Sequence, residues 1–174
     1  MEFLKITDGV RLAFAQRDQF KTAVMSLSVC VPLDEHAAAN ALLIRLLART
    51  NKKHPTTLDM NRALASLYGA TITPVVEKQG ETQVLRLLLS ALDDRFTLDQ
   101  ESVCESCMRM LFDCFFDPDV TPDGFKEENI TLEKRLLIEK IDAERDVRIQ
   151  LDDEDGDPGG LLRCLGSCRS PARA

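Results

Sequence analysis

The sequence lacks the concentration of positive charge that nucleic-acid-binding proteins need. Its 174 residues include 22 Lys and Arg against 29 Asp and Glu, which gives a net charge of −7 at pH 7. Recognition of phosphate requires clustered cations, and an anionic membrane surface attracts proteins by the same means. We therefore expect neither nucleic acid nor a membrane among the partners.

Long apolar runs are also missing. A membrane-spanning helix needs about 20 consecutive apolar residues, whereas the apolar stretch 37–48 is short and contains Asn40 and Arg45. The first residues, MEFLKITDGVRL, lack the basic, apolar and small-residue regions of a signal peptide. The sequence therefore predicts a cytoplasmic protein whose six cysteines stay reduced.

The composition that remains, 44% apolar and 29% charged, is typical of one globular domain. Its patterning predicts an α+β fold in which an antiparallel sheet is flanked by helices. The first three strands are expected to form a meander. The expected elements are strands at 3–6, 10–16 and 22–31, helices at 35–49 and 57–68, strands at 70–78 and 82–92, and helices at 100–115 and 122–148.

Several helix ends can be predicted from capping chemistry. Asp34, Thr56 or Thr57, and Asp99 are expected N-caps. Thr121-Pro122-Asp123 is expected to start the last helix, with proline at its first position. Gly69 is expected to end the second helix. The helix at 35–49 is apolar on nearly every face, so we expect it to be buried.

The composition changes abruptly at Leu151. The segment 151–174 contains four glycines and two prolines and has no sustained periodicity. We expect a domain over 1–150 followed by an irregular, disordered tail over 151–174. The helix that runs into this tail looks interrupted, which suggests a truncated or frame-shifted chain.

A family resemblance rests on five short segments and on the order of the expected elements. The chain resembles the amino-terminal domain of the insulinase/pitrilysin-type zinc metallopeptidases over roughly 1–148. Within that family it is most similar to the bacterial non-peptidase relatives associated with aminopentanol modification of elongation factor P. The segments are GVRL at 9–12, RTNKKHP at 49–55, LYGA at 67–70, LEKR at 132–135 and IEKI at 138–141.

The resemblance implies a lost active site. Catalytic members carry His-x-x-Glu-His on the helix before the Lys-Lys-x-Pro turn; two His bind zinc, the Glu activates water, and a distant Glu completes the site. These motif positions correspond to Ala41, Ile44 and Arg45, none of which can bind zinc or accept a proton from water. The distant acid alone has a possible counterpart, Glu133.

The resemblance also implies what such a chain does. It would be a fraction of a full-length member, one of several domains that form a clamshell around a peptide chamber. It would be a non-catalytic scaffold or peptide-binding half beside a zinc-bearing paralogous subunit, with no cofactor of its own. Its substrate would be a peptide or protein, and elongation factor P is a candidate link.

Two other groups of residues could suggest a metal or redox site. Cys104 and Cys107 have Cys-x-x-Cys spacing, and Cys164 with Cys168 could supply a second half. However, the first pair lies inside an expected helix and the second in the irregular tail, so we interpret Cys104 and Cys107 as buried apolar side chains. His36 and His54 would lie about 27 Å apart on a straight helix, too far to share a metal.

The acidic run 152–157 superficially resembles a calcium loop. Aligning Gly156 with the invariant glycine puts Leu151 and Leu162 at positions that require carboxylates. We therefore interpret the run as solvated charge. Two alternatives to the non-catalytic homologue stay open, namely a cysteine-based zinc or thiol enzyme and an inert truncated remnant.

Overall fold

A computed structural model of the chain describes residues 2–98 and 101–154, with side chains described for 3–98 and 101–143. The chain divides into two compact units, Met1–Ile130 and Thr131–Ala174. Helices and antiparallel strands confirm the predicted α+β class. The elements are β1 (Glu2–Thr7), β2 (Val10–Phe14), β3 (Thr22–Pro32), α1 (Ala37–Arg49), α2 (Thr57–Ser66), β4 (Thr71–Gln79), β5 (Thr82–Leu92), the short 3-10 helix η1 (Asp94–Phe96), α3 (Val103–Phe116), β6 (Val120–Thr121), β7 (Gly124–Phe125) and α4 (Glu127–Glu154).

The main sheet has three antiparallel strands in the order β3-β5-β4. β3 pairs with β5 over its whole length, from Thr22 opposite Leu92 to Pro32 opposite Thr82. β4 and β5 form the predicted hairpin, and Gly80 takes a positive φ of 61° at its turn. β5 is the central strand, and the side chains on its helix-facing side, Leu85, Leu87, Leu89 and Ala91, are buried and supply much of the core.

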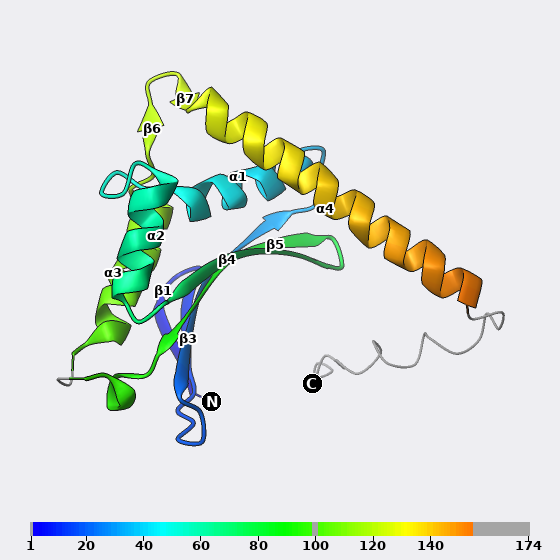
Figure 1. Cartoon of the computed structure of the whole chain (residues 1–174). Coiled ribbons are helices and arrows are strands. Elements are labelled where there is room, and N and C mark those ends of the chain that lie inside the picture. The colour runs from blue at the N-terminus through cyan, green and yellow to red at the C-terminus, as the bar shows by residue number, and fades with distance from the viewer. Residues whose placement is uncertain (1, 99–100, 155–174) are drawn as a thin grey trace. The chain divides into compact units, whose positions relative to one another are not determined.

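The core lies between this sheet and the helices α1 and α3, which pack against β5 and against each other (Figure 1). Leu87 and Leu89 on β5 and Leu111 on α3 are almost fully enclosed. The core cluster consists of Ile44, Leu47, Met60, Ala70, Leu85, Leu87, Leu89, Ala91, Val103, Cys107, Met110, Leu111 and Cys114.

The predicted meander of the first three strands is wrong. β1 and β2 form a hairpin around Gly9, but this hairpin is a separate two-stranded sheet. β3 pairs with β5 instead, about 60 residues further along the chain. Local alternation identifies each strand, but it cannot select a distant partner over a near one.

The start of α1 also differs from the prediction. His36, not Asp34, occupies the N-cap position, and its side chain makes no cap hydrogen bond. The Asp34 carboxylate instead accepts from the His36 backbone N–H at 2.9 Å, one step before the helix. The helix is less buried than predicted, because Ala38, Ala39 and Leu43 face solvent.

Two predicted ends of α2 are confirmed. The Thr56 hydroxyl accepts a hydrogen bond from the Asp59 backbone N–H at 3.1 Å. At the other end, Gly69 has a φ of 74°. The C-cap residue is Leu67, and Gly69 follows it by two residues. The Gly69 N–H donates to Ala65, and the N–H of Ala70 donates to Leu64.

The amino-terminal end of α3 is capped by a residue that precedes the helix by several positions. Its N-cap residue, Ser102, makes no side-chain cap bond, but the Asp94 carboxylate accepts from the Cys104 backbone N–H at 2.8 Å. The predicted cap Asp99 lies outside the described residues. The helix ends two residues before Pro118, as predicted.

The predicted helix start at Thr121-Pro122-Asp123 is wrong. These residues turn between the two short strands β6 and β7, in which Thr121 pairs with Gly124. Gly124 has a φ of 115°, a conformation that continues a turn and not a helix. α4 therefore begins at Glu127 and extends to Glu154, so the residues 151–154 of the predicted tail are helical. The rest of that tail lies outside the described residues.

Among the described residues, no helix combines the length and apolarity needed to cross a membrane.

Candidate functional site

The three positions that the resemblance assigns to a zinc motif lie on α1, in the first unit. Ile44 is 1% exposed and belongs to the core that α1 shares with the sheet and α3. Ala41 and Arg45 are half-buried. Methyl and methylene groups neither bind a metal nor accept a proton, and a guanidinium does neither at neutral pH. The α1 side chains therefore provide packing where a peptidase would provide zinc chemistry.

The described residues contain no grouping of three or more His, Cys, Asp or Glu side chains that could hold a metal ion. His36 is exposed at the start of α1, beside Glu35. His54 is half-buried in the turn after the helix. The structure thus keeps the two histidines at opposite ends of α1, and the absence of a metal stays a prediction.

A buried glutamine fixes the first turn of α1 against the sheet. The Gln83 side chain lies on the inner face of β5 and donates to the Ala37 carbonyl at 2.9 Å. It also accepts from the Asn40 side chain at 3.3 Å. The sequence analysis did not predict this contact. A polar residue that alternates on the same strand face as Leu85, Leu87 and Leu89 is nevertheless a pattern that indicates a buried hydrogen bond.

A tight turn after α1 is held by Asn51, which is fully buried. The Asn51 side chain accepts from the His54 backbone N–H at 2.7 Å and donates to the Cys114 sulfur at 3.6 Å. The two backbones also exchange hydrogen bonds, from the Asn51 N–H to His54 and from the His54 N–H to Asn51. Asn51 therefore links the end of α1 to α3 within the core.

Two lysines of this turn reinforce the link at the surface. Lys53 forms an ion pair with Asp113 on α3 at 2.7 Å. Lys52 forms an ion pair with Asp117, and its backbone N–H donates to the Asp117 carbonyl. The Lys-Lys-x-Pro segment thus has a structural role, because both cations bind carboxylates at the carboxyl end of α3.

Cys104 and Cys107 lie in the first turns of α3, as predicted, and Cys107 has no exposed surface. Burial raises the pKa of the Cys107 thiol, to about 11, and it also raises the pKa of Cys104. Cys114 behaves in the same way, since burial raises its pKa to about 11. A thiol is nucleophilic only when ionised. Burial therefore favours the protonated form of all three thiols at neutral pH.

The remaining predicted residues are not tested by this geometry. Glu133 lies on α4 in the second unit, so its proposed relation to the α1 positions stays a prediction. Cys164 and Cys168 lie outside the described residues. Residues 155–157 of the acidic run also lie outside the described residues.

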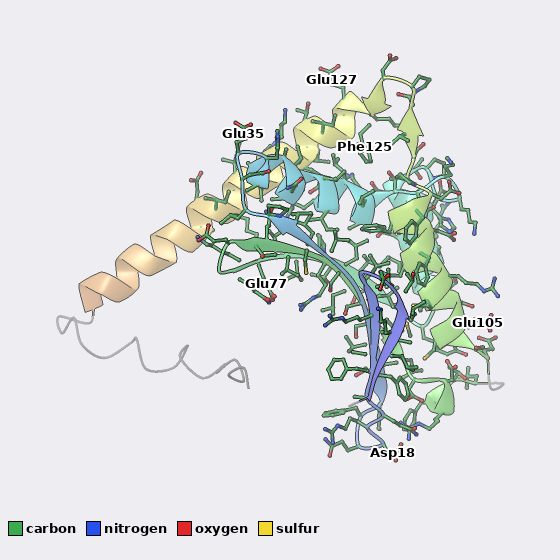
Figure 2. The ribbon with its side chains drawn as sticks, turned by 180° about the vertical axis from the view of Figure 1, so that it is seen from behind. Asp18, Glu35, Glu77, Glu105, Phe125 and Glu127 are labelled. Atoms are coloured by element: carbon green, nitrogen blue, oxygen red, sulfur yellow. The ribbon has the colours of Figure 1, made fainter. Side chains whose placement is uncertain are left out.

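The outer face of the main sheet, opposite the helices, carries polar side chains. Arg86 at its centre donates to the Ser28 hydroxyl at 3.1 Å and pairs with Glu77 at 3.5 Å. Figure 2 shows Glu77 on the side of the sheet away from α1. Within the described residues, the two outer strands β3 and β4 each have one edge that pairs with no other strand. Such edges can accept an extended peptide by backbone hydrogen bonding.

Comparisons with known proteins identify a named relative and a solved structure with a similar fold. No family model matches the chain. The chain is 27% identical over 143 residues to a Bacillus subtilis (strain 168) protein named "Probable inactive metalloprotease YmfF", and the match covers 82% of this chain and 34% of that protein. A solved structure, described as a conserved protein from Enterococcus faecalis V583, is similar with a TM-score of 0.67 and 22% identity.

The solved structure supports the fold alone, and the match covers 73% of this chain but 30% of that one. The chain thus spans about a third of the length of both relatives. Helix α1 has the core residue Ile44 and the half-buried Ala41 and Arg45 at the expected motif positions, and the chain's named relative is described as a probable inactive metalloprotease. The chain is therefore similar to an inactive metalloprotease homologue and has an α+β fold that solved proteins share.

Proposed function

We propose that the chain is a non-catalytic member, or fragment, of the insulinase-type metallopeptidase family. In this role it binds or positions a peptide beside a zinc-bearing partner of the same family. The observation that carries the proposal is the burial of Ile44, which is 1% exposed within the core at the position that the resemblance assigns to the catalytic base. The similarity to a relative named as inactive supports the same conclusion.

The main sheet offers a place for the peptide. α1 packs against β4 and β5, so the open edge nearest to the α1 positions is that of β4. Pro74 lies in β4 and has no N–H. A proline is tolerated in a sheet where its nitrogen faces an unpaired edge. The N–H groups two residues away on either side, at Ile72 and Val76, then face that edge as well.

The partner proposal is tested by mixing. The purified chain is assayed for hydrolysis of a fluorogenic peptide alone, after mixing with a paralogue that carries His-x-x-Glu-His, and beside that paralogue alone. The proposal predicts no hydrolysis by the chain alone and a higher rate in the mixture than with the paralogue alone. Equal rates with and without the chain, together with no complex on gel filtration, would contradict it.

The peptide proposal has a separate test on β4. Binding of fluorescein-labelled peptides of elongation factor P is measured by anisotropy for the native chain and for Val76→Pro. Loss of one edge N–H should weaken binding by roughly tenfold, within the range of a lost hydrogen bond. Val24→Pro, on the other outer strand β3, is the matched control and should bind normally. Equal affinity of Val76→Pro and the native chain would exclude β4 as the binding edge.

The thiol-enzyme alternative has less support, because burial raises the pKa of all three cysteines on α3. The inert-remnant alternative is favoured by one observation, the many large apolar side chains that are exposed. It predicts neither a complex with a paralogue nor peptide binding, so the two experiments above also decide it.

A further inference from the structure

The outer edge of β3 is the longest strand edge that pairs with no other strand within the described residues. Hydrogen bonds at the two ends of β3 show which backbone groups face this edge. The Leu33 N–H donates to the Glu81 carbonyl at 2.9 Å, just beyond one end. The Asp93 N–H donates to the Lys21 carbonyl at 3.0 Å, just before the other. Bonded pairs alternate along an antiparallel ladder, so the odd-numbered residues of β3 bond to β5 and the backbone groups of its even-numbered residues point outwards.

This edge lacks the features that prevent pairing along the full length of a natural edge strand. Such edges are interrupted by charged side chains, prolines or bulges. β4, on the other side of the sheet, contains Pro74, Glu77 and Lys78. None of the 11 residues of β3 is charged, and its one proline, Pro32, is the last residue. Its register with β5 also runs without a bulge. The edge of β3 is therefore suited to pairing with another strand.

Apolar side chains along the same edge are incompletely covered. Met25, Leu27 and Val31 lie on the inner face of the sheet and are only partly buried where they pack against the core. Val24 lies on the outer face and is 62% exposed. A strand paired along this edge would bring side chains beside both sets, because neighbouring strands of a sheet share its two faces.

The sequence of β3 is suited to pairing with itself. We infer that β3 pairs antiparallel with β3 of a second copy of this chain, about a two-fold axis at Leu27. Leu27 is the central residue of β3, so this register pairs the strand over its whole length. Even-numbered residues then face even-numbered residues, whose N–H and C=O groups are those that point outwards.

This register matches the side chains on both faces of the sheet. Between residues 23 and 31, every apolar residue or cysteine faces another of this kind, and serine faces serine. Serine pairs across strands can hydrogen-bond, and apolar pairs bury each other. The facing pairs are Leu27 with Leu27, Met25 with Val29, Ala23 with Val31, Val24 with Cys30, and Ser26 with Ser28.

Charges just beyond the strand favour a second copy in this orientation. Lys21 precedes β3, whereas Asp34 and Glu35 follow it, and all three residues are exposed. In the antiparallel pair, Lys21 of each copy lies at the end of the strand where the other copy has Asp34 and Glu35. Opposite charges therefore meet at both ends of the interface, whereas a parallel pair would bring like charges together.

The resulting interface is closed and symmetric, since both copies use the same edge. It extends the main sheet to six strands in the order β4-β5-β3-β3-β5-β4. The α1 helix packs on β4 and β5, and the β4 edge of each copy stays open. The inference therefore does not depend on the proposed function.

The first test is the molar mass of the full chain by light scattering coupled to gel filtration, at about 100 μM. The inference predicts twice the monomer mass of 19.5 kDa. Val24→Pro should weaken the dimer by roughly tenfold or more, because the Val24 N–H points to the interface and each copy loses that hydrogen bond. The same proline keeps the bonds to β5, since a proline nitrogen is tolerated at an open edge.

Val76→Pro, on the edge of β4, is the matched control and should stay dimeric. Circular dichroism and melting temperature check that both variants are folded. The peptide-binding test reverses their roles, because Val24→Pro should bind peptide normally and Val76→Pro should not. The two proposals can therefore fail separately. A monomeric native chain would overturn the inference, as would a dimer whose affinity is unchanged in Val24→Pro.

The second test is a cross-link that reports the register. Val24→Cys places a thiol opposite Cys30 of the second copy, and oxidation by air with a copper catalyst joins the two sulfurs as their protons and electrons pass to oxygen. Within one copy, residues 24 and 30 lie about 20 Å apart along the strand, too far for a disulfide. A covalent dimer should appear on non-reducing gels.

The native chain and Val24→Cys/Cys30→Ser are the controls for the cross-link, since each lacks one of the two facing thiols. Both retain the other cysteines of the chain, so any cross-link through those cysteines appears equally in all three samples. No more covalent dimer in Val24→Cys than in these controls would overturn the register at Leu27.

Discussion

At the scale of single residues, Ile44 stands where the family resemblance expects the catalytic glutamate of a zinc peptidase. It fills core volume against the sheet and α3, so a carboxylate there would be enclosed among apolar side chains. We predict that Ile44→Glu lowers the free energy of unfolding by roughly 3 kcal/mol or more. Leu43→Glu, one residue earlier on the exposed side of α1, should change it by less than about 0.5 kcal/mol.

Urea unfolding followed by circular dichroism measures both changes in free energy. Similar losses in the two variants would show that the position of Ile44 is no more enclosed than its neighbour. Such a result would remove the structural reason for regarding the motif positions as core.

The cysteines of α3 make stability depend on pH in the alkaline range. In the folded chain Cys107 and Cys114 have pKa values of about 11 because they are buried, against an ordinary value of 9.0. Between pH 9 and 11 the unfolded state has lost thiol protons that the folded state keeps, so stability falls as pH rises. Below pH 9 both states keep these protons and the contribution is constant.

The measurement is the urea midpoint at pH 7, 9 and 10.5, under reducing conditions. The free energy of unfolding should fall less between pH 9 and 10.5 in the double variant Cys107→Ala/Cys114→Ala than in the native chain. This difference is expected whatever the absolute stability of the variant. Cys30→Ala, at an exposed position on β3, should keep the full fall. If the double variant loses stability with pH as steeply as the native chain, the buried thiols are not the cause.

At the scale of elements, α2 depends on a cap that the sequence already indicates. The Thr56 hydroxyl accepts from the Asp59 backbone N–H and donates to the Asp59 carboxylate at 2.6 Å. Thr56→Ala should therefore lower the free energy of unfolding by about 1 kcal/mol. Thr57→Ala, at the exposed first residue of the helix, should have a much smaller effect. Equal effects would mean that the cap does not stabilise α2.

Local chemistry predicted the elements whose signals lie close together in sequence. The alternation in β4 and β5, the cap at Thr56 and the positive φ at Gly69 need no distant partner. Thr121-Pro122-Asp123 was ambiguous, because proline suits both the first turn of a helix and a tight turn. Gly124, the next residue, was the overlooked signal for the turn.

Distant contacts were beyond what local pattern could predict. β3 pairs with β5 and not with β2, Asp94 caps a helix that begins nine residues later, and Gln83 binds the first turn of α1. Each depends on how the chain returns on itself. Of the candidate site, the burial of Ile44 follows from the apolar pattern of its helix, and the assignment of the motif positions rests on the family resemblance and stays a prediction. The link from Asn51 to Cys114 could not be predicted.

At the scale of the whole molecule, the chain corresponds to about a third of its relatives. Its first unit has a well-formed core between three strands and the helices α1 and α3, yet within the described residues the β1–β2 hairpin and the outer edges of β3 and β4 pair with no further strand. The open edge of β4 is the surface that the proposed function assigns to a peptide. Helix α1, on which the family resemblance expects a zinc motif, packs against the sheet through Ile44 and Leu47.

The most direct test of this account is the zinc content of the purified full chain, measured by mass spectrometry after dialysis against a zinc-containing and then a zinc-free buffer. The account predicts far less than one zinc per chain and no hydrolysis of a fluorogenic peptide by the same sample. Stoichiometric zinc together with hydrolysis that a chelator abolishes would contradict it.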